Sequence, residues 1–127
     1  MKKIETNNAP GAIGPYSQGM VSGKLVFTSG QIPLDPKTGA IAGDTIEAQS
    51  EQALKNLQAV LEAGGAGLQT VIKTTCFLSD MGNFAAFNAV YARFFTGDCP
   101  ARSCVAVKTL PKNVLVEVEA IAETSIC

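Results

Sequence analysis

Residues 114–123 read VLVEVEAIAE, and this stretch alternates between two kinds of side chain. Alternation with a period of two is typical of a β-strand with one buried face. One face carries only Val and Ala, at positions 114, 116, 118, 120 and 122, and the other carries Leu115, Glu117, Glu119, Ile121 and Glu123. Strand geometry places Glu117 and Glu119 roughly 7 Å apart on that second face. Because neighbouring carboxylates repel, we expect at least one to hold its proton more tightly unless a cation lies nearby.

The stretch just before this strand, CPARSCVAV at 99–107, contains Arg102, one of only two arginines in the chain. The run SCVAVK at 103–108 predicts another strand, joined to the last one by a short LPKN turn. If residue 109 pairs with residue 114, Arg102 and Cys104 share the face of the two glutamates. A shift of one residue would place them on the opposite face.

The rest of the chain predicts an α+β sandwich with the order ββαββαββ, strands in hairpins and helices on one face. Asp44, with Glu47 three residues later, is the pattern of a helix N-cap, and Gly64-Gly65 ends that helix. Further strands are expected in a short N-terminal segment, KLVFTSGQI at 24–32 and VIKTTCFLS at 71–79. A second helix is expected at 83–95, with its apolar face formed by Phe84, Phe87, Asn88, Tyr91, Phe94 and Phe95. Asn88 is the polar member of that face.

The composition indicates one domain spanning residues 1–127 and narrows the possible chemistry. The chain has no histidine, which excludes the commonest general base and metal ligand. The net charge of −1 gives no reason to expect nucleic acid or a membrane surface as a partner. The start MKKIETNNAP has no apolar run after its lysines, so we expect a soluble cytoplasmic protein with its four cysteines as free thiols. Only 17% of residues are charged, which favours a buried subunit interface.

Several residues have both a structural and a functional interpretation. Arg102 needs water, a carboxylate of the protein such as Glu117 or Glu119, or an anionic ligand that its guanidinium grips with two parallel hydrogen bonds. The two glutamates either line a solvated face or supply a general base whose pKa burial and mutual repulsion adjust.

Four other positions are open in the same way. Tyr16 either packs over a turn or contacts a ligand, and Ser29 either ends a strand or contacts a ligand. Asn88 either binds a backbone group inside the fold or serves a site. Cys104 has no partner base, so a packed thiol is favoured over a nucleophile. The Gly-rich GGAGL at 64–68 closes a helix instead of opening one, which excludes a dinucleotide site.

Five segments in order resemble one family across essentially the whole chain. They are IGPYSQG at 13–19, FTSGQIP at 27–33, FNAVYARFF at 87–95, PARSCVAV at 100–107 and LPKNVLVEVEAIA at 110–122. The family is that of the reactive-intermediate imine deaminases, also called RidA or YjgF. The resemblance implies a chorismate-mutase-like α+β fold and a homotrimer with clefts between subunits. It also implies hydrolysis of 2-aminoacrylate-type enamine and imine acids to 2-keto acids and ammonia, without metal or cofactor.

The resemblance also assigns roles to residues. Arg102 matches the arginine that binds the substrate carboxylate, and Glu117 matches the acid that orients and activates the attacking water. Tyr16, Ser29, Asn88 and Cys104 match other pocket positions, Gly30 allows close approach of the backbone, and the Cys104 backbone hydrogen-bonds the ligand. The segment before Pro100 is shorter than the family pattern, with Cys99 where an aromatic residue stands. We therefore expect an altered preference for substrate size.

Two other functions are compatible with the same fold. Some relatives bind keto acids without turnover, and a base such as Glu117 is then unnecessary. Others are described as ribonucleases or translation inhibitors, and the near-neutral charge of this chain provides no electrostatic footprint for RNA.

Overall fold

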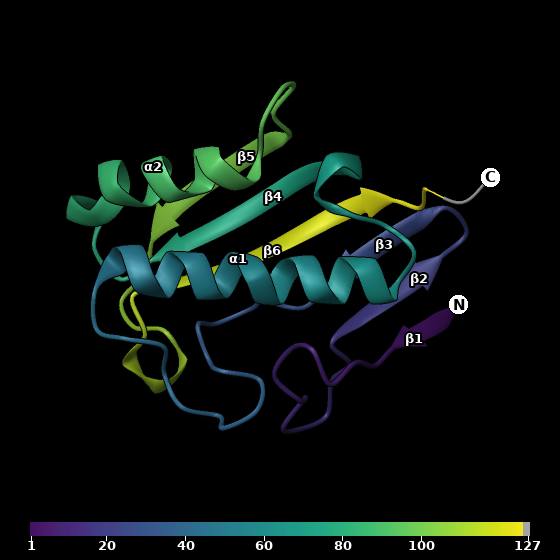
Figure 1. The fold of residues 1–127 in the computed structure, drawn as a ribbon, viewed down its shortest axis with the longest axis horizontal. Coiled ribbons are helices and arrows are strands. Elements are labelled where there is room, and N and C mark those ends of the chain that lie inside the picture. The colour runs from purple at the N-terminus through teal and green to yellow at the C-terminus, as the bar shows by residue number, and fades with distance from the viewer. Residues whose placement is uncertain (126–127) are drawn as a thin grey trace.

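The computed structural model describes residues 1–125, so Cys127 lies outside the described residues. Figure 1 shows a twisted sheet with two helices lying across one of its faces. The strands are β1 (Lys2–Ile4), β2 (Gly19–Ser22), β3 (Leu25–Thr28), β4 (Val71–Leu78), β5 (Ala101–Ala106) and β6 (Val116–Glu123). The helices are α1 (Ile46–Ala63) and α2 (Phe84–Phe94), with short 3₁₀ turns at Leu68–Thr70, Met81–Asn83 and Pro111–Asn113. The expected class, an α+β fold with helices on one face, is confirmed.

The strand order across the sheet is β1-β2-β3-β6-β4-β5. All pairs are antiparallel except β4 and β5, which run parallel. The last strand of the chain therefore lies in the middle of the sheet, where its Val and Ala face is buried against the helices. The alternation expected for 114–123 is confirmed.

Two details of the expected topology are wrong. The order is βββαβαββ, with three strands before α1 and one between the helices. The two C-terminal strands do not form a hairpin, since β5 pairs with β4 through the α2 crossover and β6 inserts between β3 and β4. The turn between them contains Lys112 and Asn113 with a positive φ of 57°, and it redirects the chain instead of returning it alongside β5.

Helix α1 begins one residue later than expected. Thr45, not Asp44, is the N-cap: its backbone is extended, and its hydroxyl accepts a hydrogen bond from the Ala48 N–H. Gly64 ends the helix as expected, and a Cβ at this position would lie 2.6 Å from Ile4 Cδ1. The buried face of α1 includes Ala53, Leu57 and Val60 at helical spacing.

Helix α2 places an aromatic row over the far end of the sheet. Phe87, Tyr91 and Phe95 are buried, with the Tyr91 ring centre 5.6 Å from that of Phe87 and 4.5 Å from that of Phe95. The Tyr91 hydroxyl lies 2.8 Å from the Thr74 hydroxyl of β4, within the buried layer. This hydrogen bond fixes the Tyr91 ring, over which the Arg102 guanidinium lies. No described helix is long and apolar enough to span a membrane.

Candidate functional site

The strand register places the two predicted chemical groups on opposite faces of the sheet. Arg102 lies opposite Thr74, which in turn lies opposite Ala120, on the face covered by the helices. Glu117 lies opposite Phe77, which lies opposite Val105, on the uncovered face. Neither of the two hairpin registers considered from the sequence forms, because β5 pairs with β4 and not with β6. Through their pairing with β4, Arg102 and the two glutamates lie on opposite faces of the sheet.

The Arg102 guanidinium is held by helix α2. Its Nη1 donates to Asn88 Oδ1 at 2.8 Å, and its Cζ lies 4.8 Å from the Tyr91 ring centre and 5.5 Å from that of Phe84. Such stacking on aromatic faces stabilises a guanidinium and restricts its orientation. Within residues 1–125, no carboxylate lies within 4.0 Å of Arg102. The structural alternative, a salt bridge to Glu117 or Glu119 within one chain, is therefore wrong. Among the described residues, Asn88 alone accepts a hydrogen bond from the Arg102 side chain, which leaves most of its five N–H donors for a ligand.

This arrangement explains the polar residue on the buried face of α2. Asn88 accepts a hydrogen bond from the Arg102 side chain, and its side chain binds no backbone group in the part of the chain that the structure describes, so the structural interpretation of Asn88 is wrong. Asn88, Phe84 and Tyr91 recur at helical spacing, and together they form the surface on which the guanidinium lies.

The cysteines near Arg102 are packed thiols. Cys104 lies opposite Cys76 across the β4–β5 pair. Burial raises the pKa of Cys76 to about 12, and burial also raises the pKa of Cys104 while Arg102 opposes that rise. Both thiols are thus protonated near neutral pH, and the predicted preference for a packed thiol at Cys104 agrees with this.

The Glu117 side chain lies in a hollow on the other side of the molecule. Residues from three loops surround it: Tyr16, Ser29, Gly30, Ile32 and Pro111. Gly30 is in close contact with the carboxylate, since a Cβ there would lie 2.7 Å from Glu117 Cδ and closer still to Oε2. Any larger residue at position 30 would displace the Glu117 carboxylate, so Gly30 shapes the hollow through this contact. Its predicted role beside a ligand stays a prediction.

The environment of Glu117 favours its protonated form. Burial raises the pKa of Glu117 above its ordinary value of 4.5, and the charge of Glu119 two residues along the same face raises it further. A carboxylate of this kind binds a proton more readily than a free glutamate, which is the property of a general base. The expectation that one member of the pair holds its proton more tightly is confirmed for Glu117.

Ser29 and Tyr16 form one wall of the hollow. The Ser29 hydroxyl donates to the Ser17 carbonyl at 2.6 Å, and the Ser29 N–H donates to the Gln18 carbonyl at 2.9 Å. These bonds join the end of β3 to the loop that carries Tyr16. The Tyr16 side chain is 53% exposed and borders the opening, so it is available to a ligand.

Three buried residues with amide side chains, Gln18, Gln31 and Asn56, hold these loops in place. The sequence patterns did not identify them as part of a site. The backbone of Gln31 exchanges two hydrogen bonds with Val118, at 2.7 and 3.1 Å. Asn56 Nδ2 donates to the Ile32 and Leu34 carbonyls, and Gln18 Nε2 donates to the Pro10 carbonyl at 2.8 Å. Gln18 and Gln31 lie within the motifs IGPYSQG and FTSGQIP, so their position beside Tyr16 and Gly30 was the available signal.

The uncovered face of the sheet carries exposed apolar side chains among polar ones such as Lys73, Thr75 and Glu119. Phe27, opposite Ile121, is 40% exposed, and Val105, opposite Phe77, is 47% exposed. Exposed apolar residues on a contiguous sheet face are typical of a surface that binds another chain. Within one chain, the sheet separates the Arg102 cluster from the Glu117 cluster.

Known proteins match this chain over nearly its whole length. The family model for "Endoribonuclease L-PSP" matches residues 6–124. A protein of Lactococcus lactis named "Putative regulator AldR" is 54% identical, with 97% of this chain and 98% of that protein covered. The "2-iminobutanoate/2-iminopropanoate deaminase" of Salmonella typhimurium is also 54% identical, with 95% and 96% covered. The crystal structure of Escherichia coli TdcF with bound serine superposes with a TM-score of 0.94 at 48% identity, with 98% and 100% covered.

Proposed function

This chain belongs to the endoribonuclease L-PSP family, also called the RidA/YjgF family, and on that basis we propose that it hydrolyses 2-imino acids to 2-keto acids and ammonia. The substrates are small imines of the 2-iminobutanoate and 2-iminopropanoate type, formed by tautomerisation of 2-aminoacrylate-like enamines. The observation that carries this proposal is the Arg102 guanidinium, oriented by Asn88 and two rings yet without a carboxylate partner among the described residues. Such a group is suited to the planar carboxylate of an imino acid.

We propose further that each site forms between two subunits of a homotrimer. Arg102, Asn88 and Cys104 of one copy supply the carboxylate-binding half, and the hollow of another copy supplies Glu117, Tyr16, Ser29 and Gly30. The location of these halves on opposite sheet faces supports this arrangement, because one chain cannot place Arg102 beside its own Glu117. The exposed apolar residues Phe27 and Val105 on the uncovered face support a contact surface there.

The reaction then requires few groups. Arg102 grips the carboxylate and so fixes C2 of the imine in front of Glu117. Glu117 accepts a proton from water as the water oxygen bonds to C2, and the C=N double bond becomes a single bond. Glu117 returns this proton to the nitrogen of the resulting carbinolamine. The C2 hydroxyl then loses its proton to solvent as the C=O bond forms, the C–N bond breaks and ammonia leaves. Neither metal nor cofactor takes part in this scheme.

The direct test is the release of keto acid from 2-iminopropanoate generated in the assay by a pyridoxal-phosphate serine dehydratase. We expect this protein to accelerate imine disappearance above the uncatalysed rate in proportion to its concentration. Saturable binding of 2-keto acids without such acceleration would establish the alternative, a non-catalytic binding protein.

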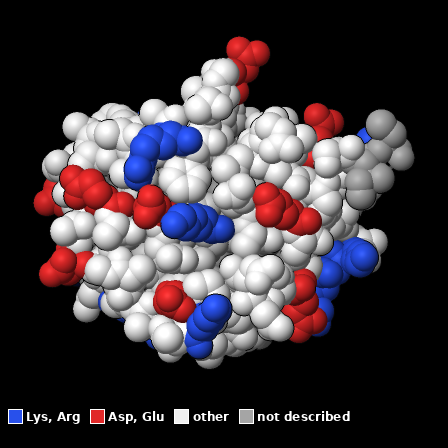
Figure 2. Space-filling view, in the orientation of Figure 1, with Lys and Arg blue, Asp and Glu red and all other residues white. Residues whose placement is uncertain are grey.

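The family name also suggests a ribonuclease, and the charge of this chain supports that function less well than imine hydrolysis. RNA binding depends on basic surface, and the net charge is −1. Figure 2 shows acidic and basic groups interspersed over the helix-covered face, without a basic patch on that face. RNA binding that weakens steeply with salt would contradict this reading.

The Glu117–Glu119 pair gives an expected pH dependence. Glu117 must be ionised to accept a proton, so kcat/KM should rise with pH through its raised pKa. In Glu119→Gln the neighbouring charge is lost while the burial of Glu117 remains. The pH range over which kcat/KM rises should therefore move to lower pH. The measurement is kcat/KM against pH for both proteins. The matched control is Glu123→Gln, because Glu123 is an exposed glutamate of the same strand. This variant should leave the rise of kcat/KM at its wild-type pH. If the rise of kcat/KM in Glu119→Gln stays at the wild-type pH, the charge of Glu119 does not influence the pKa of Glu117.

A further inference from the structure

A second cavity adjoins the Glu117 hollow. It has a volume of about 280 Å³ and lies between the loop before β2, the loop after β3 and the Pro111–Asn113 turn. Tyr16, Gly30, Ile32 and Pro111 line both the hollow and the cavity. A molecule bound at Glu117 therefore has a continuous route into this second space.

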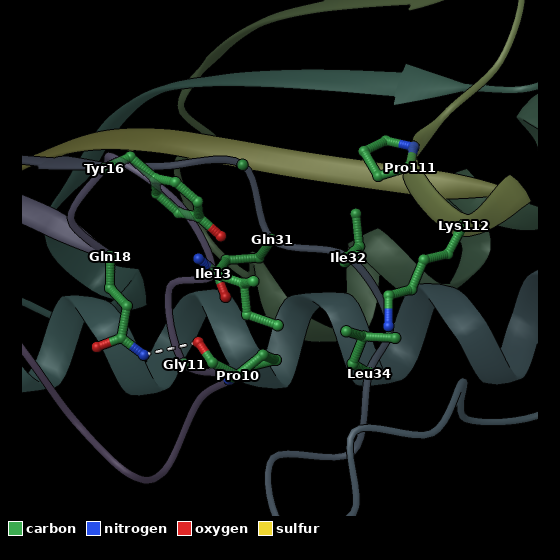
Figure 3. Close-up of a pocket in the computed structure, with 11 residues that line it drawn as sticks. Pro10, Gly11, Ile13, Tyr16, Gln18, Gln31, Ile32, Leu34, Pro111 and Lys112 are labelled. Carbon is green, nitrogen blue, oxygen red and sulfur yellow. Dashed lines mark hydrogen bonds between the residues drawn. The ribbon is translucent and has the colours of Figure 1, made fainter.

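The wall of the cavity is largely apolar. Figure 3 shows Pro10, Ile13, Ile32 and Leu34 around it, with the Tyr16 ring at one side. Ile13 is 83% exposed, although it borders a cavity that would bury it against an apolar ligand. An apolar side chain left this exposed beside a concave apolar wall is a feature of a ligand pocket.

The polar groups in the wall are mostly engaged within the protein. The Gln18 amide donates to the Pro10 carbonyl at 2.8 Å and accepts from the Thr6 N–H at 2.7 Å. The Gln31 amide donates to the Ser29 carbonyl at 3.3 Å. These two side chains therefore shape the cavity and leave little hydrogen-bonding capacity for a ligand.

Lys112 is the charged residue of the wall. The positive φ of 57° at this position sets the direction of the side chain, which runs along one edge of the cavity toward Leu34 in Figure 3. Its four-carbon stem adds apolar surface, and its ammonium group stays at the water-exposed edge.

We infer that this cavity receives the side chain of the imino acid and selects branched apolar chains, such as the isobutyl group of the leucine-derived imine, over a methyl group. The inference rests on the proposed function. With the carboxylate on Arg102 and C2 facing Glu117, the remaining substituent on C2 extends past Gly30 and Ile32 into the cavity. A pocket of this volume accommodates a four-carbon chain and not a nucleotide.

The test compares three imines, generated in the assay by oxidation of alanine, leucine and glutamate. We expect kcat/KM of the wild type to be about tenfold higher for the leucine-derived imine than for the alanine-derived one, since filling an apolar pocket gives discrimination of this size. Ile13→Asp places a charge at the cavity and should reduce that ratio about tenfold. Because Ile13 is exposed, this variant should fold normally. Met81→Asp, the same change at an exposed apolar residue outside the cavity, should leave the ratio unchanged.

Three results would overturn the inference. The first is acceleration of the alanine and leucine imines with a ratio that Ile13→Asp does not change. The second is a preference for the glutamate-derived imine that is lost in Lys112→Gln, which would assign the cavity to a second carboxylate. The third is no acceleration of any imine by the wild type, which would overturn the proposed function as well and is thereby distinguishable from the first two.

Discussion

Replacing Arg102 by alanine should reduce kcat/KM for 2-iminopropanoate by about 100- to 1,000-fold. The estimate follows from the loss of two charge-assisted hydrogen bonds to the substrate carboxylate. The loss should appear in both KM and kcat, because the same contacts that bind the carboxylate also fix C2 before Glu117. Steady-state kinetics with the imine generated in the assay gives both constants.

Arg102→Lys separates charge from geometry. Lysine keeps the positive charge but has no planar fork to match a carboxylate and cannot stack on Tyr91 and Phe84 as a guanidinium does. We expect this variant to lose about 10- to 100-fold, less than alanine but far from conservative. An activity equal to that of the wild type would show that only the charge matters.

The other arginine provides the matched control. Arg93 lies on the outer side of α2, where its Nη2 is 3.5 Å from Glu51 Oε1 and its side chain is 60% exposed. Surface ion pairs of this kind contribute little to stability, so Arg93→Ala should retain both fold and activity. If the two alanine variants lose activity equally, the role assigned to Arg102 is wrong.

The strand 114–123 shows how much the sequence could predict and why. Its alternation is a local property, so the assignment of each side chain to a face holds whichever strands it pairs with. Helix α1 and its glycine stop are local for the same reason, and the error of one residue at the cap arose because Asp44 and Thr45 are both good capping residues.

The pairing partners of β5 and β6 are non-local and were predicted wrongly. A short turn between two strands favours a hairpin, but here Leu110 is buried and the positive φ at Lys112 and Asn113 carries the chain away from β5. The parallel β4–β5 pair depends on the α2 crossover, which no short motif encodes. As a result, candidate residues for a site could be chosen from the sequence, but the separation of Arg102 and Glu117 onto two faces of the sheet could not be predicted.

Replacing Glu117 by glutamine should reduce kcat by about 100- to 10,000-fold with little change in KM, because an amide keeps the shape but accepts no proton from water. The protein should not be destabilised. The fold favours the protonated carboxyl, so above its raised pKa the ionised Glu117 is unfavourable, and a neutral amide removes that cost. Thermal unfolding at neutral pH should therefore show an equal or higher midpoint, which excludes unfolding as the cause of lost activity. If Glu117→Gln keeps the wild-type kcat, a residue other than Glu117 is the general base.

Mixing this variant with Arg102→Ala tests whether the two halves of a site come from different copies. Each variant alone has no complete site. In a trimer assembled at random from equal amounts, about a quarter of the sites combine an intact Arg102 from one copy with an intact Glu117 from another. Co-refolding the two proteins should therefore restore about a quarter of the wild-type activity, whereas mixing them without exchange of subunits should restore none. If co-refolded trimers stay inactive although their subunits have exchanged, both residues must act within a single chain, and the separation of Arg102 and Glu117 across the sheet would have to close by a rearrangement of β5 and β6.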